Sequence, residues 1–282
     1  MTQTRERHIL GISGGRDSAA LAVFMRQNHP ELPIEYFFTD TGKELAEVYE
    51  FLDKLEGFLG KPIHRLNPDR DFDFWLREYN HFLPSPKTRW CTRQLKLRPL
   101  EQWLKSDLES GTVIHSYVAI RADEPSREGY QSTHTNMKVH LPLREAGIDR
   151  AQVIEMLESA GVGEPEYYTW RTRSGCTFCF FQQKIEWVRL MREHPDAFAE
   201  AKGYEKSALD HGSPFTWSQG ESLEELGRPE RVLAIENEFE QRRKRTLARR
   251  RVNPLAGASQ TLTIDDYYGI DEASAGCVIC HK

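Results

Sequence analysis

The chain has 282 residues, of which 39% are hydrophobic and 29% are charged, and its formal net charge is −5 at pH 7. This length and composition are typical of one large α/β domain or of a domain with appendages. No apolar run approaches the ~20 residues of a membrane span, and the polar N-terminus lacks a secretory signal, so we expect a cytoplasmic protein without membrane contact. The acidic net charge argues against indiscriminate nucleic-acid binding. Five cysteines in a cytosolic chain favour ligand or redox roles over disulfides.

The first predicted element is a short buried strand over residues 8–12, which runs through a glycine-rich turn into an apolar helix. Such a turn lets backbone N–H groups close on an anion, helped by the positive end of the helix dipole. The phosphate-binding residues that we expect here are Ser13, Gly14, Gly15 and Ser18, with Arg16 adding positive charge. Asp17 either caps the helix or helps to place Mg²⁺, and the sequence leaves both roles open. The glycine spacing differs from that of a Walker A loop.

A second strand is predicted over residues 34–38, a helix over 44–59 and a third strand over 62–66. This alternation predicts a parallel sheet with right-handed crossovers, in which ligands bind beyond the carboxyl ends of the strands. The sequence Asp40-Thr41-Gly42 follows the second strand, so we expect it at the same edge as the turn at residues 13–18. The Asp40 carboxylate either holds Mg²⁺ or a ribose, or caps the next helix.

Two further segments gather arginine and lysine. A helical run at residues 87–104 surrounds Cys91 with basic side chains, which either lower the pKa of the thiol, hold an anion or form a solvated face. A fourth strand over 112–120 ends at Arg121–Arg127, where two arginines and two carboxylates follow one another. This loop indicates either a ligand contact or a surface ion-pair network.

The remaining cysteines form two Cys-Xaa-Xaa-Cys pairs, Cys176/Cys179 and Cys277/Cys280. A redox dithiol, half a zinc site and part of an iron–sulfur site all use this spacing. The second pair ends in Cys-His, the spacing of c-type haem attachment, but the missing export signal argues against haem. Cys280 is either a fourth cluster ligand, or Cys277 and Cys280 are thiols on a mobile tail that carry sulfur.

Residues 222–251 are strongly polar and helical in pattern, and they include the basic Arg242–Arg251 region. This region is either a solvated helix face or a contact for a polyanion such as DNA. Composition then shifts to a linker, so we predict a main domain over 1–215, a basic helical extension over 216–252, and a linker with a cysteine tail over 253–282.

The string at residues 13–18 resembles the pyrophosphate-loop (PP-loop) signature of the N-type ATP pyrophosphatases, the adenine nucleotide alpha hydrolases. Three further elements resemble the phosphoadenosine-phosphosulfate reductase family within that group; they are Asp40-Thr41-Gly42, Cys91 with Lys96, Pro99 and Leu100, and the loop Arg121–Arg127. The resemblance implies a Rossmann-like α/β fold, with a twisted parallel sheet, helices on both faces and a helical C-terminal extension. It also implies that ATP is cleaved between its α- and β-phosphates. The catalytic residues would then be Arg16, Asp17, Ser18 and Asp40, with Thr41, Gly42, Arg121 and Arg127 binding nucleotide.

The same resemblance implies that Cys91, Cys176 and Cys179 bind a [4Fe–4S] cluster. Iron–sulfur sulfonucleotide reductases carry Cys-Cys where this chain has Trp90-Cys91, and they end in a Glu-Cys-Gly-Leu-His motif that it lacks. The chain is more similar to the ATP pyrophosphatases of DNA phosphorothioation systems. That likeness implies adenylation coupled to sulfur transfer, with DNA as substrate and a cysteine desulfurase as sulfur donor. A sulfonucleotide reductase and an ancillary nucleotide-binding protein of a defence or CRISPR locus are the alternatives.

Overall fold

The computed structural model describes residues 5–127, 134–213, 215–218 and 220–252. Its centre is a five-stranded sheet in the order β3-β2-β1-β4-β5, with every pair of neighbours parallel. The strands are β1 (Glu6–Gly11), β2 (Ile34–Thr39), β3 (Ile63–Leu66), β4 (Val113–Tyr117) and β5 (Met137–His140). The chain builds outward from β1 to β3 and then returns to the other side of β1, so the strand order reverses between β1 and β4. Ligands of open α/β sheets bind at such a reversal.

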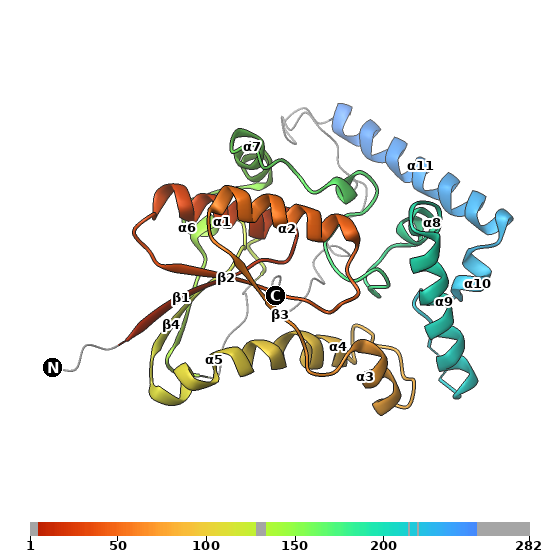
Figure 1. Cartoon of the computed structure of the whole chain (residues 1–282). Coiled ribbons are helices and arrows are strands. Elements are labelled where there is room, and N and C mark those ends of the chain that lie inside the picture. The colour runs from red at the N-terminus through yellow and green to blue at the C-terminus, as the bar shows by residue number, and fades with distance from the viewer. Residues whose placement is uncertain (1–4, 128–133, 214, 219, 253–282) are drawn as a thin grey trace.

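Helices cover both faces of the sheet, as predicted (Figure 1). One face carries α1 (Arg16–Asn28), α2 (Ala46–Leu59), α6 (Pro142–Glu145) and α7 (Arg150–Ser159), and the other carries α5 (Arg98–Ser110). Alternate residues of each strand face opposite sides, so Leu10 and Tyr36 pack in the core below α1 and α2. Ile9 and Phe37 point the other way and pack against Leu104 of α5. The predicted fold class is confirmed.

The helical run around Cys91 is more complex than predicted. It follows α3 (Phe72–Glu78) and consists of α4 (Trp90–Thr92), a π-helical turn η1 (Arg93–Leu97) and α5. The backbone N–H of Arg98 bonds to the carbonyl of Arg93, and Pro99, which has no N–H to donate, comes next. A π-turn within a helix is rare and often marks a functional site.

The C-terminal half of the described chain is helical. It contains the short η2 (Glu166–Thr169), then α8 (Lys184–Glu193), α9 (Pro195–Asp210), α10 (Leu223–Leu226) and α11 (Pro229–Val252), of which α10 and α11 fall within the extension predicted over 216–252. α8 contacts α9, α10 and α11, and its Trp187 is fully buried. The polar segment predicted as one helix is divided at Gly227 and Arg228, because α11 restarts at Pro229, a residue favoured at the first position of a helix. No described helix is long and apolar enough to cross a membrane.

Candidate functional site

The loop Ser13–Ser18 connects β1 to α1 and is closed by its own hydroxyl groups. The Ser18 hydroxyl accepts a hydrogen bond from the backbone N–H of Ser13 at 3.0 Å and donates one to the carbonyl of Gly15 at 3.0 Å. The Ser13 hydroxyl lies 3.0 Å from that of Ser18 and accepts from the N–H of Gly15 at 3.3 Å. The first turn of α1 is therefore fixed directly behind the loop, where helical N–H groups favour an anion.

Close approach of other segments explains both glycines of this loop. Gly14 has a φ of +75°, and a Cβ there would lie 2.7 Å from Cγ1 of Val48 in α2. A Cβ on Gly15 would lie 3.0 Å from the Ser174 hydroxyl oxygen and 3.1 Å from that of Tyr168. A Cβ at Gly14 would therefore force Val48 or the loop to shift and would strain the backbone, whereas a Cβ at Gly15 would be in tight contact with the two hydroxyl groups.

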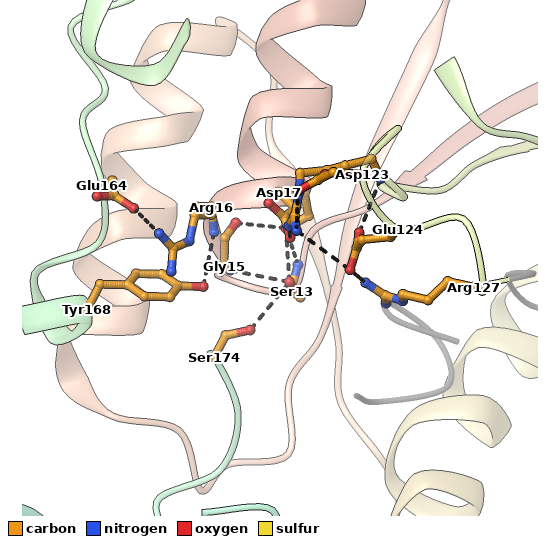
Figure 2. A network of polar contacts seen from close by, with 12 residues as sticks. Ser13, Gly15, Arg16, Asp17, Asp123, Glu124, Arg127, Glu164, Tyr168 and Ser174 are labelled. Atoms are coloured by element: carbon orange, nitrogen blue, oxygen red, sulfur yellow. Dashed lines mark hydrogen bonds and ion pairs between the residues drawn. The ribbon is translucent and has the colours of Figure 1, made fainter. Parts of the chain in front are cut away.

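The segment from Glu164 to Ser174 forms a second wall of the loop (Figure 2). The Tyr167 hydroxyl donates to the carbonyl of Gly14 at 2.6 Å, and the Ser174 hydroxyl lies 3.5 Å from that of Ser13. Arg16 turns toward this wall, because its guanidinium pairs with Glu164 at 2.7 Å and stacks 4.0 Å from the ring centre of Tyr168. The predicted role of Arg16 in neutralising pyrophosphate stays a prediction.

Sequence reasoning missed this second wall. Its residues are some 150 positions from the loop, at separations of 153 for Tyr167 and Gly14 and 161 for Ser174 and Ser13. Nothing local in a sequence encodes such a contact. The aromatic cluster at residues 167–170 was the single signal available.

Asp17 and Arg121 form the central ion pair of the site, at 2.7 Å, and their side chains are 11% and 14% exposed. Arg121 follows β4 and also pairs with Asp123 at 2.8 Å, while Glu124 pairs with Arg127 (Figure 2). Burial by itself would lower the pKa of Arg121, but the carboxylates of Asp17, Glu124 and Asp123 raise it above its usual value. The structure therefore brings Asp17 to Arg121 across the β1–β4 reversal. The suggestion that Asp17 caps α1 is wrong, because the N-cap is Gly15 and no side chain makes a capping hydrogen bond there. A role of Asp17 in placing Mg²⁺ stays a prediction.

Asp40 lies in the turn after β2, as predicted. Its carboxylate accepts from the N–H of Gly42 and from the hydroxyl of Tyr49, both at 2.8 Å. Burial and this bond to Asp40 raise the pKa of Tyr49. The suggestion that Asp40 caps the next helix is wrong, because α2 begins at Ala46 and its N-cap is Leu45.

The first cysteine pair lies against this turn. The Cys176 sulfur is 3.5 Å from the Thr41 hydroxyl, and the N–H of Thr177 donates to the carbonyl of Lys43 at 2.8 Å. Arg171, which is fully buried, donates to the carbonyls of Gly175 and Cys176 at 3.0 and 2.6 Å and fixes the segment. Burial raises the pKa of the Cys176 thiol well above its usual value, and Glu44 raises it further. One edge of the sheet thus carries the glycine loop, the Asp40 turn and a thiol.

A family model for the phosphoadenosine phosphosulfate reductase domain matches residues 7–157. The chain belongs to this phosphoadenosine phosphosulfate reductase family. The match spans β1 to α7 and so includes the glycine loop, the Asp40 turn and the Arg121 loop.

Three relatives of this chain are uncharacterized proteins. Two from Methanocaldococcus jannaschii are 25% identical over 193 residues and 24% identical over 191 residues, each match covering 66% of this chain. The chain spans less than half of their length, 39% and 44%. A 37.8 kDa protein of Escherichia phage 186 is 23% identical over 258 residues, covering 71% of this chain and 74% of that protein.

Two solved structures are similar to this chain. Phosphoadenylyl-sulfate reductase from Candida auris, in a phosphate complex, has a TM-score of 0.47 and 16% identity, covering 60% of this chain and 81% of its own. NMN synthetase from Francisella tularensis has a TM-score of 0.38 and 15% identity, covering 84% and 86%.

Three of the predicted metal ligands, Cys91, Cys176 and Cys179, lie within the described residues. All three are partly buried and form no disulfide within the described residues, and Cys91 and Cys176 pack on the hydrophobic core. Within the described ranges, no group of three ligand atoms within 4.8 Å of one another includes a cysteine, so these thiols do not form the compact set of one zinc ion. A [4Fe–4S] cluster spreads its thiolates over separate irons and does not require so compact a set. The cluster stays a prediction, and Cys277 and Cys280 lie outside the described residues.

Two basic regions were also predicted, and they differ in shape. Along η1 runs a groove of about 530 Å³ lined by Arg89, Arg93 and Arg98 together with Glu101, next to Cys91 in the sequence. On α11, by contrast, Arg242 to Arg245 are exposed on a helix surface, and Arg243 pairs with Glu240 at 3.4 Å. The part of the Arg242–Arg251 region beyond residue 246 has no described side chains. Contact of α11 with DNA stays a prediction.

Proposed function

We propose that the protein binds ATP with Mg²⁺ at Ser13–Ser18 and transfers the AMP group to an oxygen of its substrate, which releases pyrophosphate. A sulfur nucleophile then displaces AMP, which leaves with that oxygen, so that sulfur takes the oxygen's place in the substrate. One observation carries this proposal. The segment that holds the thiol of Cys176 also forms the second wall of the glycine loop, through Tyr167, Tyr168 and Ser174. A phosphate cradle and a thiol therefore lie along one sheet edge.

The loop supplies what a leaving pyrophosphate requires. Fixed N–H groups at a helix N-terminus stabilise charge that develops on phosphate oxygens, and they do so without rearrangement. Arg121 lies at the same reversal of the sheet and adds a buried positive charge held by Asp17. Asp17 and Asp40 offer the oxygen ligands that Mg²⁺ prefers.

Support for sulfur transfer to a polyanion comes from the thiols and from the basic groove. The groove along η1 presents Arg89, Arg93 and Arg98, side chains suited to a phosphate backbone. Cys91 lies in α4, directly before η1, and Cys176 lies at the Asp40 turn. We propose DNA as the substrate, a cysteine desulfurase as the sulfur donor and a [4Fe–4S] cluster on Cys91, Cys176 and Cys179 as the carrier.

The test is the product formed from radiolabelled ATP by full-length protein prepared anaerobically. AMP and pyrophosphate are expected, and Ser18→Ala and Asp17→Ala should abolish their formation. Ser106→Ala removes an exposed hydroxyl from α5 and serves as the matched control, with turnover unchanged. ADP as the main product would contradict the assignment. Addition of DNA and a desulfurase should stimulate AMP release; no stimulation would remove DNA from the proposal while leaving the ATP chemistry intact.

The family match itself favours a second candidate, reduction of a sulfonucleotide. That reaction needs a nucleophilic thiol, for which Cys277 or Cys280 would have to serve. Release of sulfite from phosphoadenylyl sulfate in the presence of thioredoxin or glutaredoxin would establish it. Our proposal predicts no sulfite above the level given by a Cys277→Ser/Cys280→Ser variant.

A further inference from the structure

A group of histidines lies on three neighbouring strands of the sheet, β1, β4 and β5. Parallel pairing sets His8 of β1 opposite His115 of β4, and Tyr117 opposite His140 of β5. Side chains alternate along a strand with a period of two, so Glu6 projects from the same face as His8. Three potential metal ligands thus share one face of two neighbouring strands.

The three side chains are close enough to hold one ion. The rings of His8 and His115 stack with their centres 4.6 Å apart and their planes 10° apart. One ligand atom from each of Glu6, His8 and His115 lies within 4.8 Å of the others, and no other His, Cys, Asp or Glu group in the described part of the chain meets this spacing. Nε2 of His115 is buried, makes no hydrogen bond with a described residue and lies 3.8 Å from the Glu6 carboxylate.

Neighbouring side chains hold both rings in the orientation that a metal requires. Nδ1 of His8 lies 2.8 Å from the Tyr117 hydroxyl, and Nδ1 of His115 lies 2.9 Å from Nε2 of His140. A ring that donates its Nδ1–H to such a partner keeps the lone pair of Nε2 for a metal.

We propose that Glu6, His8 and His115 bind a divalent transition-metal ion of the Zn²⁺ class, with Tyr117 and His140 as positioning residues. Two imidazoles and one carboxylate are a common protein ligand set for zinc and leave a fourth position open. Mg²⁺ and Ca²⁺ prefer all-oxygen sets and fit these ligands poorly. The ion would join β1 and β4, the strands whose carboxyl ends lead to the glycine loop and to Arg121. The site is independent of the proposed ATP chemistry.

Cobalt(II) is the probe, because its absorption spectrum distinguishes this site from the cysteines. Thiolate ligands add an intense charge-transfer band that a nitrogen and oxygen site lacks. Full-length, metal-free protein should bind about one equivalent of Co²⁺ without that band, and Zn²⁺ should displace it. His115→Ala should not bind this equivalent of Co²⁺. His140→Ala should bind it with an affinity about 10- to 100-fold lower, the usual effect of removing a side chain that positions a metal ligand. His64→Ala, on β3 and exposed, is the control and should leave it unchanged.

A second variant protects the test against misfolding. Glu6 is exposed, with 55% of its side chain accessible, so the Glu6→Gln variant should fold normally. Its affinity for Co²⁺ should be at least tenfold lower than that of the native protein. Thermal unfolding followed by circular dichroism, with chelator and with Zn²⁺, should show a metal-dependent rise in Tm for the native protein and none for His115→Ala. The proposal is overturned if the native protein binds no Co²⁺ outside the thiolate sites, or if Glu6→Gln and His115→Ala bind it as tightly as the native protein.

Discussion

The sheet edge that carries the glycine loop and the basic half of α11 are both rich in arginine, but the arginines differ in burial and in the sequence distance to their partners. At the edge, the side chains of Arg16 and Arg121 are 6% and 14% exposed, and their partners lie 148 and 104 residues away in the sequence. On α11, Arg243 is 48% exposed, and its partner Glu240 is three residues away.

This difference shows which charges are built into a site. Buried pairs at the edge are weakly screened, and each is fixed by the packing of separate segments, so loss of one member leaves an uncompensated charge. An exposed pair within one helix contributes little to stability and is screened by salt. Four predictions, from the largest expected effect to the smallest, test this contrast.

Arg121→Met should lower the free energy of unfolding by about 3 kcal/mol, because it leaves the Asp17 carboxylate buried without its partner. Adding Asp17→Asn should restore part of the loss in a double-mutant cycle measured by urea unfolding. Lys105→Met is the control, since its pair with Glu109 is exposed and should contribute under about 1 kcal/mol. Equal losses for Arg121→Met and Lys105→Met would erase the contrast.

Tyr167→Phe should cost about 1–3 kcal/mol of stability, because the buried carbonyl of Gly14 loses its hydrogen bond at 2.6 Å. ATP affinity should fall as well, since this bond joins the second wall to the loop. Tyr204→Phe removes a hydroxyl of α9 that is bonded to Asp73 and Glu200 at 2.8 and 3.0 Å and forms no hydrogen bond with a described residue of the loop or its second wall, so it should leave ATP affinity unchanged. If the two variants lower the affinity for ATP equally, the second wall has no specific role in binding ATP.

Glu221→Gln should cost about 1 kcal/mol at pH 7, because Glu221 pairs with Lys184 of α8 and with Arg231 of α11. Hydrogen bonds from Arg231 lower the pKa of Glu221 from 4.5 to about 2. A carboxylate with a lowered pKa stabilises the fold above its unfolded pKa, so the difference between native protein and variant should shrink as the pH falls from 4.5 toward 2. Glu238→Gln is an exposed control, and a difference that stays constant with pH would rule out the charge as the cause.

Arg243→Ala should change the free energy of unfolding by less than about 0.5 kcal/mol, since its pair is exposed and local. Raising the salt concentration should not alter that difference measurably. A loss comparable to that of Arg121→Met would show that the basic half of α11 is structural after all.

The sequence predicted the elements whose signals are local. The short sequence of a strand, a glycine turn and a helix at residues 8–25 predicts a phosphate-binding loop. The alternation of strands and helix over residues 34–66 predicts the strands that lie parallel to the first. The edge location of Asp40 followed from that topology alone. Arg121 was placed there for the same reason.

Other features lacked a local signal. β5 has only four residues, Met-Lys-Val-His, too few and too polar to be distinguished as a buried strand. The pairing of Asp17 with Arg121 and the contact of Tyr167 with Gly14 depend on how distant segments pack, which periodicity does not report. The facing of His8 and His115 became visible only when the register of β1 and β4 was known.

The central claim is that nucleotide binds at the glycine loop and its second wall. The most direct test is a calorimetric titration of the protein with α,β-methylene-ATP in the presence of Mg²⁺, because this analogue resists cleavage. The native protein should bind about one equivalent. Ser18→Ala should bind roughly tenfold or more weakly, because a lost hydrogen bond to a charged phosphate site costs about 1.5–3 kcal/mol, while Arg243→Ala should match the native protein. Native affinity in Ser18→Ala, or a loss confined to Arg243→Ala, would contradict the account.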